Sequence, residues 1–207
     1  LRNSMLAVSV LFLLLAGLVF YGFQLKKKDN KIISSAMEKS DQLLLNILPA
    51  GIANDLKEKG KTEPQLFENV TICFVDIVNF THKSTTISPV VLIEELNQIF
   101  TAFDNIIEKY SCERIKTIGD SYMAVSGLPV PDPRHAYQIV SCCVDMIHFI
   151  RKRNTKSPHT WEIRVGVHTG EVIAGVVGVK KYIYDVFGDS INTASRMESN
   201  SEPMKIN

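Results

Sequence analysis

The sequence lacks an excess of charge of either sign. It holds 23 Lys and Arg residues against 22 Asp and Glu residues, which leaves a formal net charge of +1 over 207 residues. A protein that binds nucleic acid usually gathers a clear excess of basic residues on one surface. The charge balance therefore gives no indication of a nucleic-acid partner, and we expect none.

The sequence also lacks a cysteine pattern that would hold a metal or a set of disulfides. Its four cysteines do not follow the paired spacings of zinc sites, and the first lies inside an apolar run. We expect these thiols to be reduced, and buried or idle. The cysteines are Cys73, Cys112, Cys142 and Cys143.

An initiating methionine is missing as well. The chain begins at Leu1 and stops at Asn207 within an unfinished pattern. We therefore expect a piece of a longer protein, in which residues 1–4 are the end of a truncated flank. A chain of 207 residues can hold one domain of ordinary size and additional segments.

A long apolar run, Met5–Phe23, is present near the start of the chain. As a helix rising about 1.5 Å per residue it would extend roughly 30 Å, which matches the hydrocarbon core of a bilayer. Three lysines, residues 26–28, follow at once, and such charge marks the cytoplasmic side. We expect a transmembrane helix over 5–23 and a membrane protein whose catalytic domain is cytoplasmic, with a signal peptide as the alternative.

Residues 24–60 predict a juxtamembrane signalling helix that is interrupted at Pro49. The apolar stripe along this helix has no core of its own to cover, so we expect it to form a short coiled coil with a second copy of the chain. The alternative is a helix packed on its own domain. The stripe has apolar residues at helical spacing, namely Ile32, Ile33, Ala36, Met37, Leu43, Leu44, Ile47 and Leu48.

From residue 66 onward the pattern alternates between strands and helices, which predicts an α+β domain over 66–207. The order β-α-β-β-α-β is that of the ferredoxin-like fold, with one antiparallel sheet and helices on one face. The predicted strands are 70–75, 113–118, 121–126, 161–169, 171–177 and 182–186, with turns at Gly119-Asp120 and Gly170, and the predicted helices are 89–110, 134–153 and 190–198.

Two carboxylates are placed where they could meet in this fold. Asp76 follows the first strand, and Asp120 lies in the turn of the hairpin that neighbours it. Two carboxylates held close together repel each other unless a cation lies between them, and Mg²⁺ prefers such oxygen ligands. Ordinary turn chemistry is the alternative for Asp120, and a helix N-cap or a loop acid is the alternative for Asp76.

Four segments resemble the signature segments of class III adenylate and guanylate cyclases. They cover the domain in the order found in that family, and residues 43–49 (LLLNILP) resemble the helix that precedes the catalytic domain in membrane-bound members. The four segments are 74–81 (FVDIVNFT), 114–123 (RIKTIGDSYM), 165–171 (VGVHTGE) and 184–196 (YDVFGDSINTASR).

The resemblance implies a role for each matching position. Two Mg²⁺ ions per site, which Mn²⁺ can replace, would be held by two acids and a backbone carbonyl, and the site would form between two copies of the chain. The implied residues are Asp76, Asp120 and the carbonyl of Ile77 for the metals, Phe80 and Thr81 around the phosphates, Lys116 and Asp185 for the purine, Asn192 for the ribose, and Arg196 for the reacting phosphate.

The purine-reading residues favour ATP over GTP. Lys116 can only donate hydrogen bonds and ionised Asp185 can only accept them. Adenine offers the complementary acceptor and donor, whereas guanine presents the reverse. Guanylate cyclases of the family typically carry Glu and Cys at these positions. We therefore expect an adenylate cyclase that makes 3′,5′-cyclic AMP and pyrophosphate.

Two other functions stay open from the sequence. One is a guanylate cyclase, and the other is a catalytically silent domain that relays a signal by dimerising below a membrane sensor. Silent domains usually lose a metal acid or the arginine, and this chain keeps both. A diguanylate cyclase shares the general topology, but its Gly-Gly-Asp/Glu-Glu-Phe turn is absent from the sequence.

Overall fold

The computed structural model describes residues 2–178 and 180–207, and for residues 2–14, 16 and 19 it describes the backbone alone. The chain forms two compact units, residues 1–53 and 54–207.

The first unit is helical. Helix α1 (Arg2–Leu45) ends just before Pro49, and α2 (Ala50–Lys59) begins directly after it and continues into the second unit. The break at Pro49 is as predicted. In the described part of the chain, no helix is long and apolar enough to span a bilayer. The predicted membrane helix, 5–23, lies for its greater part outside the residues whose side chains are described.

The second unit has an α+β fold. Its strands form one sheet in the order β2-β3-β1-β4-β5, in which every neighbouring pair is antiparallel. The first four strands keep the predicted ferredoxin-like topology, and β5 extends the sheet. The elements are β1 (Gln65–Ile77), α3 (Phe80–Ser84), α4 (Pro89–Lys109), β2 (Glu113–Ile118), β3 (Ser121–Ser126), α5 (His135–Asn154), β4 (Ile163–Val177), β5 (Ile183–Phe187) and α6 (Asp189–Ser199).

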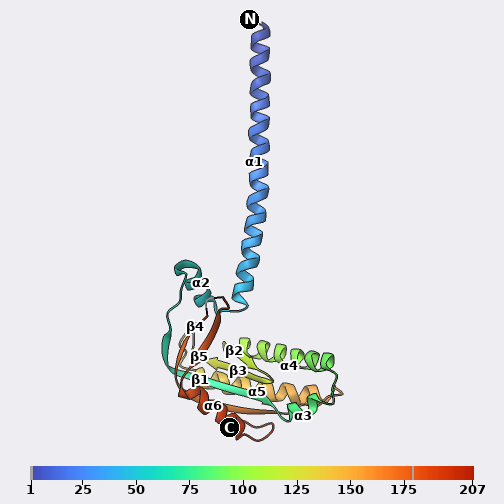
Figure 1. The fold of residues 1–207 in the computed structure, drawn as a ribbon, viewed down its shortest axis with the longest axis vertical. Helices are drawn as coiled ribbons and strands as arrows, with labels where there is room; N and C mark the ends of the chain where they lie inside the picture. The colour runs from blue at the N-terminus through green and yellow to red at the C-terminus, as the bar shows by residue number, and fades with distance from the viewer. Residues whose placement is uncertain (1, 179) are drawn as a thin grey trace. The chain divides into compact units, whose positions relative to one another are not determined.

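The main core lies between the sheet and helices α4 and α5, which are side by side in Figure 1. Phe103 of α4 meets Tyr122 of β3 edge to face, with ring centroids 5.5 Å apart, and both side chains are buried. Removing a buried aromatic side chain of this kind costs about 3–5 kcal/mol. All four cysteines are buried and free, as expected.

The predicted hairpin at Gly170 is wrong. Strand β4 runs without a break through this glycine, which pairs with Val70 of β1. A Cβ atom on Gly170 would overlap Ser190 Oγ of α6. The glycine therefore allows close packing of a helix on the strand rather than a turn.

Helix α6 corrects a second expectation, that all helices cover one face of the sheet. Val165 of β4 belongs to the core under α4 and α5. Its neighbour Gly166 points to the opposite face, where an added Cβ atom would overlap backbone atoms of Glu198 and Ala194 in α6. The short helix α3 and the N-terminal extension of β1 to Gln65 are further features that the sequence pattern did not indicate.

Candidate active site

The structure brings Asp76 and Asp120 together at the end of β1. Strand β3 pairs with β1, and Ser121 at its start donates a hydrogen bond from Oγ to Oδ1 of Asp76 over 2.7 Å. The backbone N–H groups of Ile77 and of Asp120 itself favour the ionised form of the Asp120 carboxylate, which also lies within the reach of the charge of Asp76. The two acids that were predicted as metal ligands are thus neighbours.

An arginine that the sequence analysis did not single out lies beside this pair. Arg164 of β4 is the direct cross-strand partner of Asp76, and its Nη2 atom donates to Asp76 Oδ2 over 2.9 Å. On its other side, Nε lies 3.1 Å from Oε1 of Glu198 in α6. Only one local feature of the sequence marked Arg164, namely that it is a basic residue inside a strand-like run. Its partner Asp76 is 88 positions away, so the sequence did not indicate the pairing.

Two carboxylates thus contact the guanidinium of Arg164, and the carboxylate of Asp120 lies within the reach of its charge. Burial, followed by the charge of Asp76, raises the pKa of the Asp120 carboxyl group. Burial and then the charge of Asp76 also raise the pKa of Glu198. Positive charge from Arg164 opposes both shifts without cancelling them. The site is short of positive charge when its acids are ionised, which favours an added cation.

The residues fit a hard divalent cation in their chemistry. Asp76 and Asp120 supply carboxylate oxygens, and the carbonyl of Ile77 adjoins them, which suits Mg²⁺ because it retains water or substrate oxygens as further ligands. Among the described residues, no three His, Cys, Asp or Glu side chains converge into a metal-binding group. Substrate oxygens would therefore have to complete the coordination.

The raised pKa of Asp120 predicts a pH-dependent stability. Since the folded-state pKa exceeds the unfolded value of about 4, ionising Asp120 costs folding free energy. The cost is absent below that value and grows as the pH rises toward the folded-state pKa. Asp120→Asn should therefore raise the melting temperature at pH 7 and leave it unchanged near pH 3. Thermal unfolding at both pH values tests this, and a less stable variant at pH 7 would contradict it.

Lys116 and Asp185 form a direct ion pair. Nζ of Lys116 lies 2.6 Å from Oδ2 of Asp185, and the second carboxylate oxygen accepts from the backbone N–H of Val186. The two residues come from β2 and β5, the opposite edges of the sheet, which approach each other here. The residues that were predicted to read the purine are thus joined, with donor and acceptor side by side.

Asn192 and Arg196 lie one helical turn apart on α6, and both are exposed. Within the described part of the chain, neither side chain has a hydrogen-bond or ion-pair partner. Ala194 and Glu198 occupy the buried side of the same helix. The structure therefore presents these two predicted residues outward, away from the sheet on which α6 packs.

Phe80 and Thr81 begin α3, directly after Asn79, whose φ of 56° turns the chain. The ring of Phe80 packs on Trp161, with centroids 6.2 Å apart, so its side chain belongs to the core. Thr81 is exposed. Contact of these two residues with phosphates stays a prediction, and for Phe80 it would involve the backbone.

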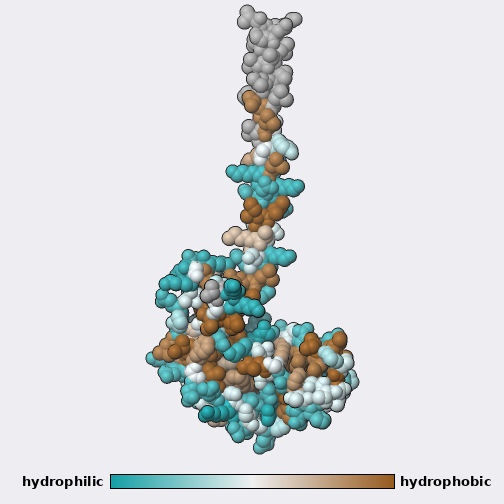
Figure 2. All heavy atoms as spheres, in the orientation of Figure 1, coloured by the Kyte–Doolittle hydropathy of each residue, from teal (hydrophilic) through white to brown (hydrophobic). Residues whose placement is uncertain are grey.

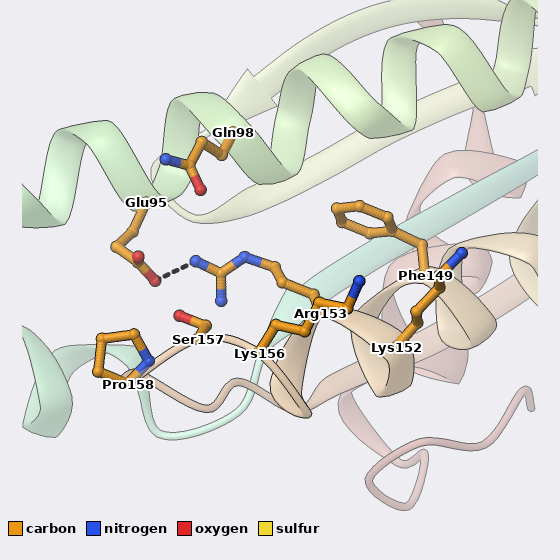
Figure 3. A pocket seen from close by; sticks show the side chains of 8 residues that line it. All are labelled: Glu95, Gln98, Phe149, Lys152, Arg153, Lys156, Ser157 and Pro158. Carbon is orange, nitrogen blue, oxygen red and sulfur yellow. Dashed lines mark hydrogen bonds and ion pairs between the residues drawn. The ribbon is translucent and has the colours of Figure 1, made fainter.

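A cavity of about 550 Å³ lies between α4 and the chain after α5, and contains none of the predicted site residues. Figure 3 shows Arg153 pointing across it to Glu95, whose carboxylate also accepts from Trp161 Nε1 over 2.7 Å. Glu95, Arg153 and Trp161 therefore satisfy one another, and none of these three groups is free to react. A second cavity, of about 470 Å³, adjoins the start of α6 and is lined partly by Phe187 and Ser190.

The fold and the paired carboxylates are those of an α+β domain with a candidate metal site. Comparison with known proteins shows the family to which this domain belongs. Residues 62–207 match the family described as the adenylate and guanylate cyclase catalytic domain. The chain belongs to this family.

Some relatives are named guanylate cyclases and others adenylate cyclases. The chain is 41% identical over 179 residues to the receptor-type guanylate cyclase Gyc76C of Drosophila melanogaster, covering 85% of this chain and 12% of the relative. It is 36% identical over 182 residues to an adenylate cyclase of Mycobacterium bovis, covering 87% of this chain and 41% of the relative. The chain thus spans less than half the length of either protein.

A solved structure agrees in fold. The guanylyl cyclase domain of the RhoGC fusion protein from Blastocladiella emersonii, described as a non-canonical dimer, superposes with a TM-score of 0.65 at 36% sequence identity, and the match covers 69% of this chain and 79% of that chain.

Proposed function

We propose that this chain is the catalytic part of an adenylate cyclase, which converts ATP to 3′,5′-cyclic AMP and pyrophosphate. The ribose 3′-oxygen bonds to the α-phosphorus, the bond from that phosphorus to the β-phosphate oxygen breaks, and the hydroxyl proton leaves to solvent. Bound Mg²⁺ ions, held by Asp76, Asp120 and the carbonyl of Ile77, would lower the pKa of the attacking hydroxyl and bind the leaving phosphates.

The chain's own side chains would orient the nucleotide. The amide of Asn192 can hold a ribose oxygen, which fixes the direction of attack. The guanidinium of Arg196 has no partner within the described part of the chain, and suits the charge that develops on the reacting phosphate. Arg164 supplies a second guanidinium beside the carboxylate of Asp76, where it would add positive charge next to bound phosphates.

One observation carries the choice of ATP, namely the contact of 2.6 Å between Lys116 Nζ and Asp185 Oδ2. A donor and an acceptor held side by side match the N1 acceptor and the amino donor of adenine. Guanine would set its O6 against a carboxylate and its N1–H against an ammonium group. Unpaired buried groups of this kind cost about 1–3 kcal/mol each.

A guanylate cyclase is the second candidate, because relatives with that name match the chain at least as well as those named adenylate cyclases. Turnover of each nucleotide with Mg²⁺ or Mn²⁺ separates the two functions. We expect kcat/KM for ATP to exceed that for GTP by about tenfold or more. Preference for GTP would support the second candidate, and no turnover of either would support a silent relay domain.

An exposed apolar surface supports a dimer. Leu66, Ile173 and Phe187 are cross-strand partners in a row across β1, β4 and β5, so their side chains share one face of the sheet. They are 61%, 47% and 47% exposed. Asp185 lies on the same face of β5, two residues before Phe187. A second copy covering this face would bury the apolar row and enclose the purine-reading pair.

We also propose a membrane-anchored protein, with residues 5–23 in the bilayer and the catalytic domain in the cytoplasm. The lysines at 26–28 support this orientation. In the rest of α1, Ile32, Ile33 and Met37 are 58–65% exposed. Figure 2 shows apolar side chains alternating with polar ones along this part of the helix. Pairing with the same helix of a second copy would bury them.

A further inference from the structure

The side of α6 that faces the sheet carries a buried carboxylate to which the proposed chemistry gives no role. The side chain of Glu198 is 8% exposed, and its Oε1 lies 3.1 Å from Nε of Arg164. Neither atom has a hydrogen-bond partner among the described residues. Burying a charged pair with such incomplete bonding costs free energy. Packing alone therefore does not explain a glutamate at this position.

The same guanidinium also contacts a predicted metal ligand. Nη2 of Arg164 donates to Oδ2 of Asp76 over 2.9 Å, so Arg164 lies between Asp76 and Glu198. The position of Glu198 is fixed, because α6 packs on the backbone of Gly166 with no space for a Cβ atom. Without Glu198, the guanidinium could turn fully toward Asp76 and bind it with two parallel hydrogen bonds. That pairing would occupy the carboxylate that a cation needs.

We propose that Glu198 is a positioning residue that holds Arg164 back from Asp76, so that a divalent cation can displace the guanidinium there while Arg164 stays at the site. The inference rests on the proposed function, because it takes Asp76 and Asp120 as the metal seat. It adds a residue that touches neither metal nor substrate and acts through Arg164.

The test measures metal binding by stability rather than by turnover. Thermal unfolding of the full chain in rising Mn²⁺ gives the concentration of half-maximal stabilisation. Glu198→Gln should raise this concentration by about threefold to tenfold, since partners in one network are coupled to this degree. Arg164→Gln should lower it, because the cation then has no internal competitor. Glu198→Asp, which keeps the charge, should return the value toward that of the parent.

Two control comparisons distinguish a positioning role of Glu198 from a general effect of its negative charge. Glu202→Gln removes an exposed acid, paired with Lys205 and four residues further on, and should leave the Mn²⁺ response unchanged. In the Arg164→Gln background, Glu198→Gln should change the half-maximal Mn²⁺ concentration by less than about twofold. An equal shift in both backgrounds would overturn the proposal, because Glu198 would then act only as a distant charge.

Two further results would also count against it. A lower melting temperature for Glu198→Gln with an unchanged Mn²⁺ midpoint would show a purely structural role. If the parent chain itself gave no response to Mn²⁺, both the metal seat and the role of Glu198 would be wrong. A normal response in the parent without coupling would overturn the role of Glu198 and leave the proposed function intact.

Discussion

An equal mixture of Asp76→Ala and Arg196→Ala chains should recover about a quarter of the parent activity, although each variant alone is nearly inactive. Each single change should lower kcat by about 10²–10³ or more. Random pairing makes half of the dimers mixed, and a mixed dimer has one intact site out of two. The expectation follows from the outward direction of Arg196 on α6, opposite to the side that packs near Asp76.

A matched control uses two acids of the same metal seat. A mixture of Asp76→Ala and Asp120→Ala chains should recover nothing, since each chain then lacks one ligand of its own pair. Cyclic AMP formation is the measurement, with mixed dimers confirmed by two different affinity tags. Recovery in the control, or no recovery in the first mixture when mixed dimers are present, would contradict a site shared between two copies.

Exchanging the purine-reading pair should reverse the choice of nucleotide. The double variant Lys116→Glu with Asp185→Cys presents an acceptor to guanine N1–H and removes the carboxylate that faces O6. Two mispaired groups at about 1–3 kcal/mol each should change the ratio of kcat/KM for ATP and GTP by about a hundredfold or more. Steady-state kinetics with both nucleotides provides the measurement.

The single variants and a neighbouring pair provide the controls. Either change alone should lower kcat/KM for ATP without a matching rise for GTP. In each single variant, the unchanged residue of the pair still presents the wrong hydrogen-bonding group to guanine. Arg114 lies on the same strand as Lys116 and pairs with Asp104 over 3.0 Å. Arg114→Gln should therefore leave the nucleotide ratio unchanged. A double variant that kept the parent's preference would show that these residues do not read the base.

The sequence predicted correctly the helices and strands that are determined by residues close together in the chain. Helix α4 has a strong apolar period and begins at Pro89, a favourable first-turn residue, directly after its N-cap Ser88. The hairpin of β2 and β3 has its predicted ends, because Gly119 adopts the φ of 62° that its turn requires. Gly170 misled the prediction, since a glycine needed for close packing and a glycine needed for a turn look alike in sequence.

The sequence predicted those site residues that combine a reactive side chain with a position at the end of a predicted strand. Asp76 lies near the end of β1 and Asp120 lies in the turn before β3, and the pairing of these two strands brings them together. Arg164 and Glu198 could not be inferred in this way, because their roles depend on the register of β4 against β1 and on α6 covering the second face. Both are long-range properties that a local pattern does not contain.

The ion pair between Lys116 and Asp185 sets a condition on substrate entry. Nζ and Oδ2 contact each other over 2.6 Å between the two edge strands, β2 and β5, so each group already holds the kind of partner that a purine would need. A base would have to come between them and exchange one ion pair for two hydrogen bonds of its own. A ring with the complementary acceptor and donor would make this exchange at little cost, whereas any other ring would leave both charges without partners.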